Sequence, residues 1–192
     1  MIMFRKLLEY GKNKGPCYED DKTNIKSYFT WAKESLYTYL LLKSSEKNIL
    51  LNWFRLFYVY GPGQKEGSLI PTLINSFMDS KKPNIKTPLN KNDFVFVKDV
   101  TRIFTKALEN DLRSGVYNLG SGYSTSVYDI CSIIEKEITG KTLISNDLLK
   151  YGQKDESVNF WANMDKIESA LDHSCDTSIA DGIYEQLRLM SS

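Results

Sequence analysis

Residues 54–64 constrain the fold of this chain most strongly, because an apolar run rich in β-forming residues ends abruptly in Tyr60-Gly61-Pro62-Gly63. Val, Phe and Tyr side chains favour strands. Pro62 lacks a backbone donor, and the flanking glycines permit positive φ angles. The pattern therefore predicts a buried strand over 48–59 that delivers its last residues to a loop. In open α/β sheets, ligands bind just outside the carboxyl ends of strands, so we expect binding chemistry at this point.

Helical and strand patterns alternate along the rest of the chain, which predicts a single domain of the α/β class. Residues 12–26 read as a loop and residues 81–92 as a polar connection. Asp99 is the expected N-cap of one helix, and Gly140 is expected to end another. The predicted strands are 1–9, 48–59, 94–97, 115–119 and 160–162, and the predicted helices are 27–45, 69–79, 99–108, 127–139, 165–171 and 179–190.

Charge and cysteine content exclude several classes of function. The 25 basic and 24 acidic residues leave a net charge of +1, which provides no field to attract nucleic acid or an anionic membrane. Cys17, Cys131 and Cys175 are far apart and odd in number, so neither a disulfide framework nor a metal site is expected. No apolar stretch approaches the ~20 residues of a membrane span. We therefore expect a cytoplasmic protein without nucleic-acid or membrane partners.

A dinucleotide-binding turn is absent from the sequence. Such a turn needs a strand, a GxGxxG segment and a helix whose N-terminus faces the pyrophosphate. Gly120-Ser121-Gly122 is the nearest match, but it lacks the third glycine and leads into a Ser/Thr cap. The chain therefore does not carry its own dinucleotide fingerprint.

Several short motifs nevertheless occur in a characteristic order. They are Tyr10-Gly11, Glu19, Lys33, Arg55 with Tyr60-Gly61-Pro62-Gly63-Gln64, residues 93–100 (DFVFVKDV) and residues 115–122 (GVYNLGSG). This order resembles the NAD-dependent nucleotide-sugar epimerases and dehydratases, which are extended short-chain dehydrogenase/reductases similar to UDP-glucose 4-epimerase. The resemblance runs from about residue 9 to residue 185.

The resemblance implies the C-terminal portion of such an enzyme. The expected fold is a partial doubly wound, Rossmann-like sheet that lacks its N-terminal βαβ units, joined to a small C-terminal α/β substrate-binding lobe. Residues 1–60 and 93–110 would form the sheet side, and residues 61–92 and 111–192 the substrate lobe. A truncated gene product, or a start site placed inside a longer reading frame, is the expected origin of such a chain.

The resemblance also implies a set of catalytic and cofactor residues. Members of the family use a Tyr-x-x-x-Lys pair on one helix, and the lysine holds the nicotinamide ribose of NAD. Lys33 matches that lysine, but Phe29 occupies the tyrosine position and offers no ionisable proton. Tyr28 is the neighbouring phenol, rotated about 140° from Lys33 unless a local bulge intervenes. Lys33, Phe57 and Tyr58 are the implied cofactor contacts, and no hydroxyl precedes Tyr10 within residues 4–8.

The implied substrate is a nucleotide-sugar. By resemblance, the region around Tyr58, Ser68 and Leu69 would approach it, with backbone amides near the diphosphate. Asn92 stands where the family usually has a phosphate-binding arginine, so Lys91 would serve as a point charge instead. The implied substrate contacts are Tyr58, Ser68, Leu69, Lys91, Asn92 and Lys154, and no metal is implied.

Each of these residues also has a purely structural interpretation. Tyr58 and Tyr60 would be core aromatics, and Lys33 a solvated helix residue. Asp93 would be a turn residue, and Asn118 with its following glycines a turn that supports the site. The only histidine, His173, has no partner at the spacing of a triad or a metal site.

Two hypotheses of different class follow. The first is an epimerase/dehydratase-like protein of sugar-nucleotide or surface-polysaccharide metabolism, inactive alone, whose complete reaction would remove a hydride from a sugar carbon. The second is a non-catalytic remnant or a dimerisation partner of a full-length enzyme. The wide apolar surface of helix 27–45 suggests a homodimer formed through that helix.

Overall fold

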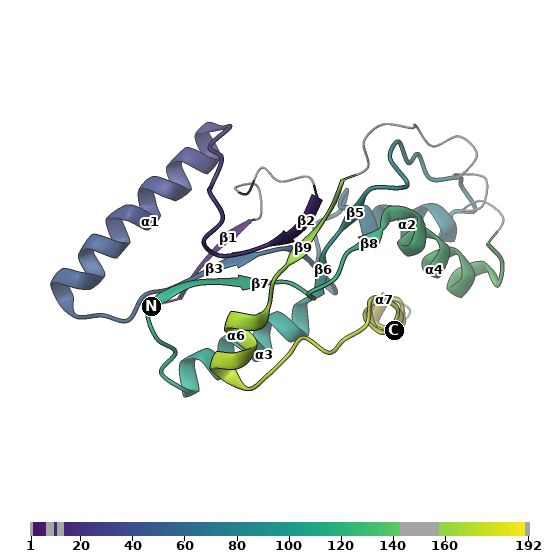
Figure 1. The fold of residues 1–192 in the computed structure, drawn as a ribbon. Helices are drawn as coiled ribbons and strands as arrows, with labels where there is room; N and C mark the ends of the chain where they lie inside the picture. Colours follow the sequence, from purple (N-terminus) through teal and green to yellow (C-terminus); the bar gives the residue numbers. More distant parts are fainter. Residues whose placement is uncertain (1, 7–9, 11–13, 143–157, 191–192) are drawn as a thin grey trace.

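The computed structural model describes residues 2–6, 10, 14–142 and 158–190, with residues 2–6 described as backbone only. Its main sheet is parallel, with the strand order β1-β3-β7 (Figure 1). The strands are β1 (Ile2–Lys6), β3 (Asn52–Leu56) and β7 (Gly115–Leu119). The first four residues of β3 are buried, as expected for a parallel sheet covered on both faces.

Two smaller sheets extend this framework. β2 (Lys14–Cys17), β9 (Asn159–Ala162), β5 (Lys91–Asn92) and β8 (Thr125–Ser126) form a sheet in that order, in which only the β5–β8 pair is antiparallel. β4 (Tyr58–Tyr60) pairs in parallel with β6 (Phe94–Phe96). Because β3 and β4 are separated only by Phe57, the chain changes sheets within one residue.

Apart from α1, the described helices pack on two hydrophobic cores. One core lies around β3, β7 and β9, under α3 and α6, and includes Phe54, Ile103 and Ile167. The other lies between β6 and the helices α2, α4 and α7, and includes Ile74 and Ile130. The helices are α1 (Tyr28–Lys47), α2 (Leu69–Met78), α3 (Val97–Glu109), α4 (Val127–Thr139), α6 (Asp165–Leu171) and α7 (Ile179–Met190).

Helix α1 stands apart from the other helices (Figure 1). Only Thr30 and Ser44 of its 20 residues are buried, and Tyr37 contacts Trp53 of β3 with ring centres 5.0 Å apart. Its N-terminus carries a capping box between Ser27 and Thr30, which stabilises the first turn. The helix is therefore well formed locally but little covered by the described part of the chain.

The structure confirms the α/β class and most of the predicted elements, and it corrects several. The predicted strand 48–59 is two strands in different sheets, and residues 14–17 of the predicted loop form β2. Asp99 is not the N-cap of α3, because the helix begins at Val97 with Phe96 at the cap position. β7 joins the main sheet and β2 the second sheet.

Candidate functional site

A buried polar network joins the carboxyl-side ends of β3 and β7. Arg55 Nη1 donates to the Tyr10 hydroxyl at 2.9 Å and to the Glu19 carbonyl at 2.8 Å. The Tyr10 hydroxyl in turn donates to Asn118 Oδ1, and the Asn118 amide N–H donates to Glu19 Oε1 at 2.9 Å. Four residues far apart in the sequence are thereby fixed to one another. We call Tyr10, Glu19, Arg55 and Asn118 the Arg55 network.

Burial dominates the electrostatics of this network. Desolvation raises the pKa of Tyr10 to about 12, although the nearby Arg55 guanidinium acts in the opposite direction. The tyrosine is therefore a neutral hydrogen-bond donor at physiological pH. Arg55 is also buried, and its guanidinium packs 4.8 Å from the centre of the Tyr10 ring, a geometry that adds a cation–π attraction.

A second buried polar centre is the side chain of Asp93, which is completely inaccessible to solvent. Asp93 Oδ1 accepts from the Ser121 amide at 2.6 Å and the Ser121 hydroxyl at 2.7 Å. Oδ2 accepts from the amides of Gly122 at 3.2 Å and Ala162 at 3.0 Å. Desolvation raises the pKa of Asp93, and these hydrogen bonds oppose the rise.

Tyr58 begins β4 beside an aromatic group. Its ring centre lies 5.5 Å from that of Phe94 and 6.5 Å from that of Phe160. Tyr58 remains 39% exposed, so the ring presents surface to a ligand, and partial burial raises its pKa. Tyr60, by contrast, is buried in the second core, as the core interpretation predicted.

The other predicted substrate residues lie on two elements. Lys91 is exposed and Asn92 half-buried, and together they form β5, directly before Asp93. Ser68 occupies the N-cap position of α2, and within the described structure its side chain makes no capping hydrogen bond to the helix that begins at Leu69. The prediction for Lys154 lies outside the described residues.

The predicted catalytic residues lie on the first turns of α1. Residues 28–47 are α-helical throughout, so no bulge brings Tyr28 toward Lys33. Lys33 instead shares a face with Phe29, and its ammonium lies 5.9 Å from the centre of that ring. Tyr28 is 92% exposed. Phe57, a predicted cofactor contact, is fully buried, and its amide donates to the Leu119 carbonyl at 3.0 Å.

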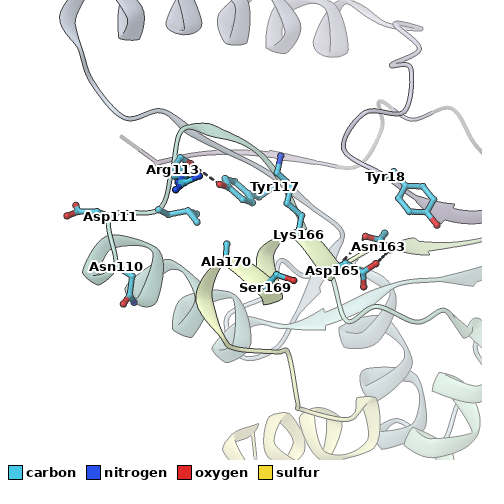
Figure 2. A pocket seen from close by; sticks show the side chains of 11 residues that line it. Tyr18, Asn110, Asp111, Arg113, Tyr117, Asn163, Asp165, Lys166, Ser169 and Ala170 are labelled. Carbon is cyan, nitrogen blue, oxygen red and sulfur yellow. Dashed lines mark hydrogen bonds between the residues drawn. The ribbon is translucent and has the colours of Figure 1, made fainter.

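The groove shown in Figure 2 has a volume of about 770 Å³ and lies at the amino end of β7. Lys166 crosses it, donating to the Val116 carbonyl at 2.7 Å with its ammonium 4.8 Å from the centre of the Tyr117 ring. The Tyr117 hydroxyl donates to the Arg113 carbonyl at 2.8 Å. None of the predicted site residues that the structure describes lines this groove, so it is separate from the candidate site.

Two kinds of feature are absent from the residues that the structure describes. Their His, Cys, Asp and Glu side chains form no group of three or more that could hold a metal ion. Their helices include none with the length and apolar character that crossing a bilayer requires.

Sequence reasoning did not assign a role to the two buried polar centres. Tyr10, Glu19 and Arg55 were recognised only as motif positions, and Asp93 was interpreted as a turn residue. The signal available was a charged residue within an otherwise apolar strand segment, as at Arg55, and an aspartate directly before Phe94-Val95-Phe96. Charged residues at such positions are almost never fully buried unless they are paired.

The sequence of this chain is similar to one protein family and to several known proteins. Residues 8–120 match the model of the NAD dependent epimerase/dehydratase family. The chain is 27% identical to the CDP-abequose synthase of Salmonella muenchen over 137 residues, and 27% identical to the dTDP-4-dehydro-6-deoxyglucose reductase of Escherichia coli over 139 residues. Each alignment covers 70% of this chain but only 46% and 44% of the relatives.

A solved structure is similar over nearly the whole chain. The UDP-glucuronic acid 4-epimerase of Bacillus cereus in complex with NAD superposes with a TM-score of 0.83 at 25% identity. The match covers 99% of this chain and 59% of the epimerase chain. The chain thus spans about half the length of the two sequence relatives and about three fifths of this enzyme.

Proposed function

Because this chain belongs to the NAD dependent epimerase/dehydratase family, we propose that it provides the nucleotide-sugar-binding side of such an enzyme. The relatives support a nucleotide-sugar ligand, since their names specify CDP-, dTDP- and UDP-linked sugars. The observation that carries the proposal is the arrangement around Asp93. Tyr58 begins the strand next to it, and Lys91 and Asn92 directly precede it.

The proposed ligand contacts come from two regions of the fold. Tyr58, Lys91 and Asn92 are the proposed contacts of one region, with the exposed Lys91 as the cation for a phosphate. The first turn of α2 is the other proposed contact region, where Ser68 and Leu69 lead into a helix whose initial amide groups favour anions. Lys154 is the further proposed contact. A nucleoside diphosphate linked to a sugar has the charges that this arrangement suits.

The described residues do not fit the pyrophosphate of NAD. The only glycine turn of similar form is Gly120-Ser121-Gly122, and its Ser121 and Gly122 amides already donate to the Asp93 carboxylate. Those donors are consequently not available to a second anion. In a complete enzyme of the family, Lys33 is the residue proposed to meet the nicotinamide ribose. Phe57 and Tyr58 were the other expected contacts, but Phe57 is enclosed in the core.

Catalysis by this chain alone is therefore not part of the proposal. Phe29 occupies the position four residues before Lys33 and cannot exchange a proton. Tyr28 is the phenol next to Phe29, yet it lies on a different face of α1 from Lys33. We propose that the chain binds a nucleotide-sugar without oxidising it.

Thermal unfolding with a panel of ligands tests this proposal. A ligand that binds only the folded state raises the melting temperature, by about 5 °C near saturation for a domain of this size. We expect a shift with one of UDP-glucose, CDP-glucose or dTDP-glucose, and none with NAD. A shift with NAD and no shift with any nucleotide-sugar would contradict the proposal.

A second proposal, that the chain is a non-catalytic dimerisation partner, rests on helix α1. Tyr28, Trp31, Tyr39 and Leu42 are exposed and lie on one face of the helix. The helix is about 30 Å long, so two antiparallel copies could bury this stripe against each other. We propose a homodimer through this face, or a mixed dimer with a full-length family member.

Sedimentation velocity with two charge variants tests the dimer. Trp31→Glu is expected to give monomers at concentrations where the unmodified chain is dimeric. Leu108→Glu is the matched control, because Leu108 is equally exposed but lies on α3. A monomeric unmodified chain, or equal dissociation by both variants, would count against this interface.

The proposed location is the cytoplasm. Cys131 and Cys175 are free thiols, and Cys17 is buried, which suits a reducing compartment. Fractionation of cells that express the chain would test this, with recovery in the membrane or secreted fraction as the contrary result.

A further inference from the structure

The Asp93 carboxylate joins three parts of the fold that are distant in sequence. Its four hydrogen bonds reach the turn after β7 through Ser121 and Gly122, and the end of β9 through Ala162. The Asp93 carbonyl accepts from the Tyr58 amide at 3.0 Å. One residue therefore fixes β4, β6, β9 and the turn relative to one another.

The packing around this carboxylate leaves no space for adjustment. A Cβ atom added at Gly120 would collide with Asp93 Oδ2 and would lie 2.8 Å from the Ala162 Cβ. Real Cβ contacts are not this short, so the turn approaches the carboxylate as closely as a glycine permits. Any movement of the Asp93 side chain must therefore move the turn or β9 as well.

The carboxylate accepts four hydrogen bonds. Three of the donors are backbone amides and the fourth is the Ser121 hydroxyl. An asparagine side chain would direct its NH₂ group at some of these donors, whichever way the amide is turned. Replacing Asp93 by Asn therefore keeps the shape of the side chain while breaking about half of its contacts.

The strands held in this way carry the proposed ligand contacts. Lys91 and Asn92 form β5 and directly precede Asp93. Lys91 pairs with Asn159 of β9 and Ser126 of β8. Tyr58 contacts Phe160 of β9 through its ring. The position of β9 relative to β4 and β5 thus sets the distance between the aromatic and the charged sides of the site.

We propose that Asp93 is a positioning residue for the nucleotide-sugar, a role that rests on the proposed function. The carboxylate holds the end of β9 and the turn after β7, so that Tyr58 and Lys91 face the ligand at a fixed separation. Asp93 does not contact the ligand, because its oxygens are fully buried and occupied. Loss of the carboxylate therefore weakens binding through the geometry of its neighbours.

The test compares ligand affinity with stability in three variants. Asp93→Asn removes the carboxylate, and Ser121→Ala removes one of its donors with little change in volume. Asp99→Asn is the matched control, because Asp99 is also buried and accepts from the Thr177 amide and hydroxyl but carries none of the proposed contacts. Affinity is measured by calorimetry with whichever of UDP-glucose, CDP-glucose or dTDP-glucose the unmodified chain binds most tightly.

We expect about a 10-fold weaker affinity for Asp93→Asn and about 3-fold for Ser121→Ala, the range produced by losing one or two buried hydrogen bonds. Measurements are made at a temperature where all the variants are folded. Asp99→Asn is expected to lower the melting temperature while changing the affinity less than 2-fold. This separation of affinity from stability would not arise if Asp93 were only structural.

Three results would overturn the proposal in distinguishable ways. If Asp93→Asn is folded and binds as tightly as the unmodified chain, the positioning role fails and the proposed function stands. If Asp93→Asn does not fold, the affinity of Ser121→Ala decides: an unchanged affinity means that the positioning role fails and the proposed function stands. If the unmodified chain binds none of the three nucleotide-sugars, the proposed function fails and the positioning role fails with it.

Discussion

The Lys33 ammonium lies 5.9 Å from the centre of the Phe29 ring, on the same face of helix α1. A tyrosine at position 29 would therefore hold its hydroxyl near a positive charge. Such a charge favours the phenolate. This relationship means that the chain retains the lysine and the helical geometry but not the ionisable group.

Phe29→Tyr should consequently create a phenol with a lowered pKa. We expect the new group to titrate up to about one unit below 10, less than a buried pair would give because this face is solvated. The absorbance difference at 295 nm between the variant and the unmodified chain isolates the added phenol. In the double variant with Lys33→Met the lowering should disappear, and equal titration in both variants would contradict the geometry.

Arg55→Lys should destabilise the chain. A lysine cannot reproduce the guanidinium that bonds the Tyr10 hydroxyl and the Glu19 carbonyl and packs on the Tyr10 ring. We expect the free energy of unfolding to fall by about 1–3 kcal/mol in urea titrations. Arg113→Lys is the control, because the Arg113 side chain is exposed, and it should change stability by less than about 0.5 kcal/mol. Equal effects would show that the Arg55 network contributes nothing specific.

Alkaline pH should unfold the chain partly through Tyr10. Its pKa is raised to about 12 in the folded state, against about 10 when unfolded. The contribution of Tyr10 to the free energy of unfolding is therefore fully present below pH 10 and is lost as the pH rises from 10 to 12. Urea midpoints measured across pH 8–12 should fall less steeply for Tyr10→Phe than for the unmodified chain. Parallel curves would mean that Tyr10 titrates alike in both states.

Gly182→Ala should destabilise α7 although alanine is the better helix former. An added Cβ would lie 2.8 Å from Tyr60 Cζ and 2.9 Å from Cε2, so the substitution overpacks the second core. We expect a loss of about 1–3 kcal/mol. Combining it with Tyr60→Phe should recover part of this loss, because the hydroxyl is the group in closest contact. Strict additivity of the two substitutions would contradict this contact.

Elements with a clear local signal could be predicted from the sequence. Helices α6 and α7 have the predicted bounds, and Gly140 ends α4 in the left-handed conformation, as predicted. Elements that depend on distant partners could not. β2 contains Gly15-Pro16 and becomes a strand only by pairing with β9, and proline is tolerated there because edge positions need no ladder donor.

The candidate site shows the same division. The order of the motifs identified the family, whereas the ligand position expected at the end of the predicted strand 48–59 stays a prediction. The local signals at Arg55 and Asp93 did not identify their hydrogen-bond partners, because these partners are up to 69 residues away. The change of sheet at Phe57 was missed for the same reason. The Phe57 backbone N–H donates to the Leu119 carbonyl, whereas the Tyr58 backbone N–H donates to the Asp93 carbonyl.

Isothermal titration calorimetry of the intact chain tests the central claim most directly. NAD and the three nucleotide-sugars are titrated separately, and the claim concerns which of the two classes binds. The account predicts saturable heat with one nucleotide-sugar and no measurable binding of NAD. Saturable binding of NAD, together with no measurable binding of any of the three nucleotide-sugars, would contradict this claim.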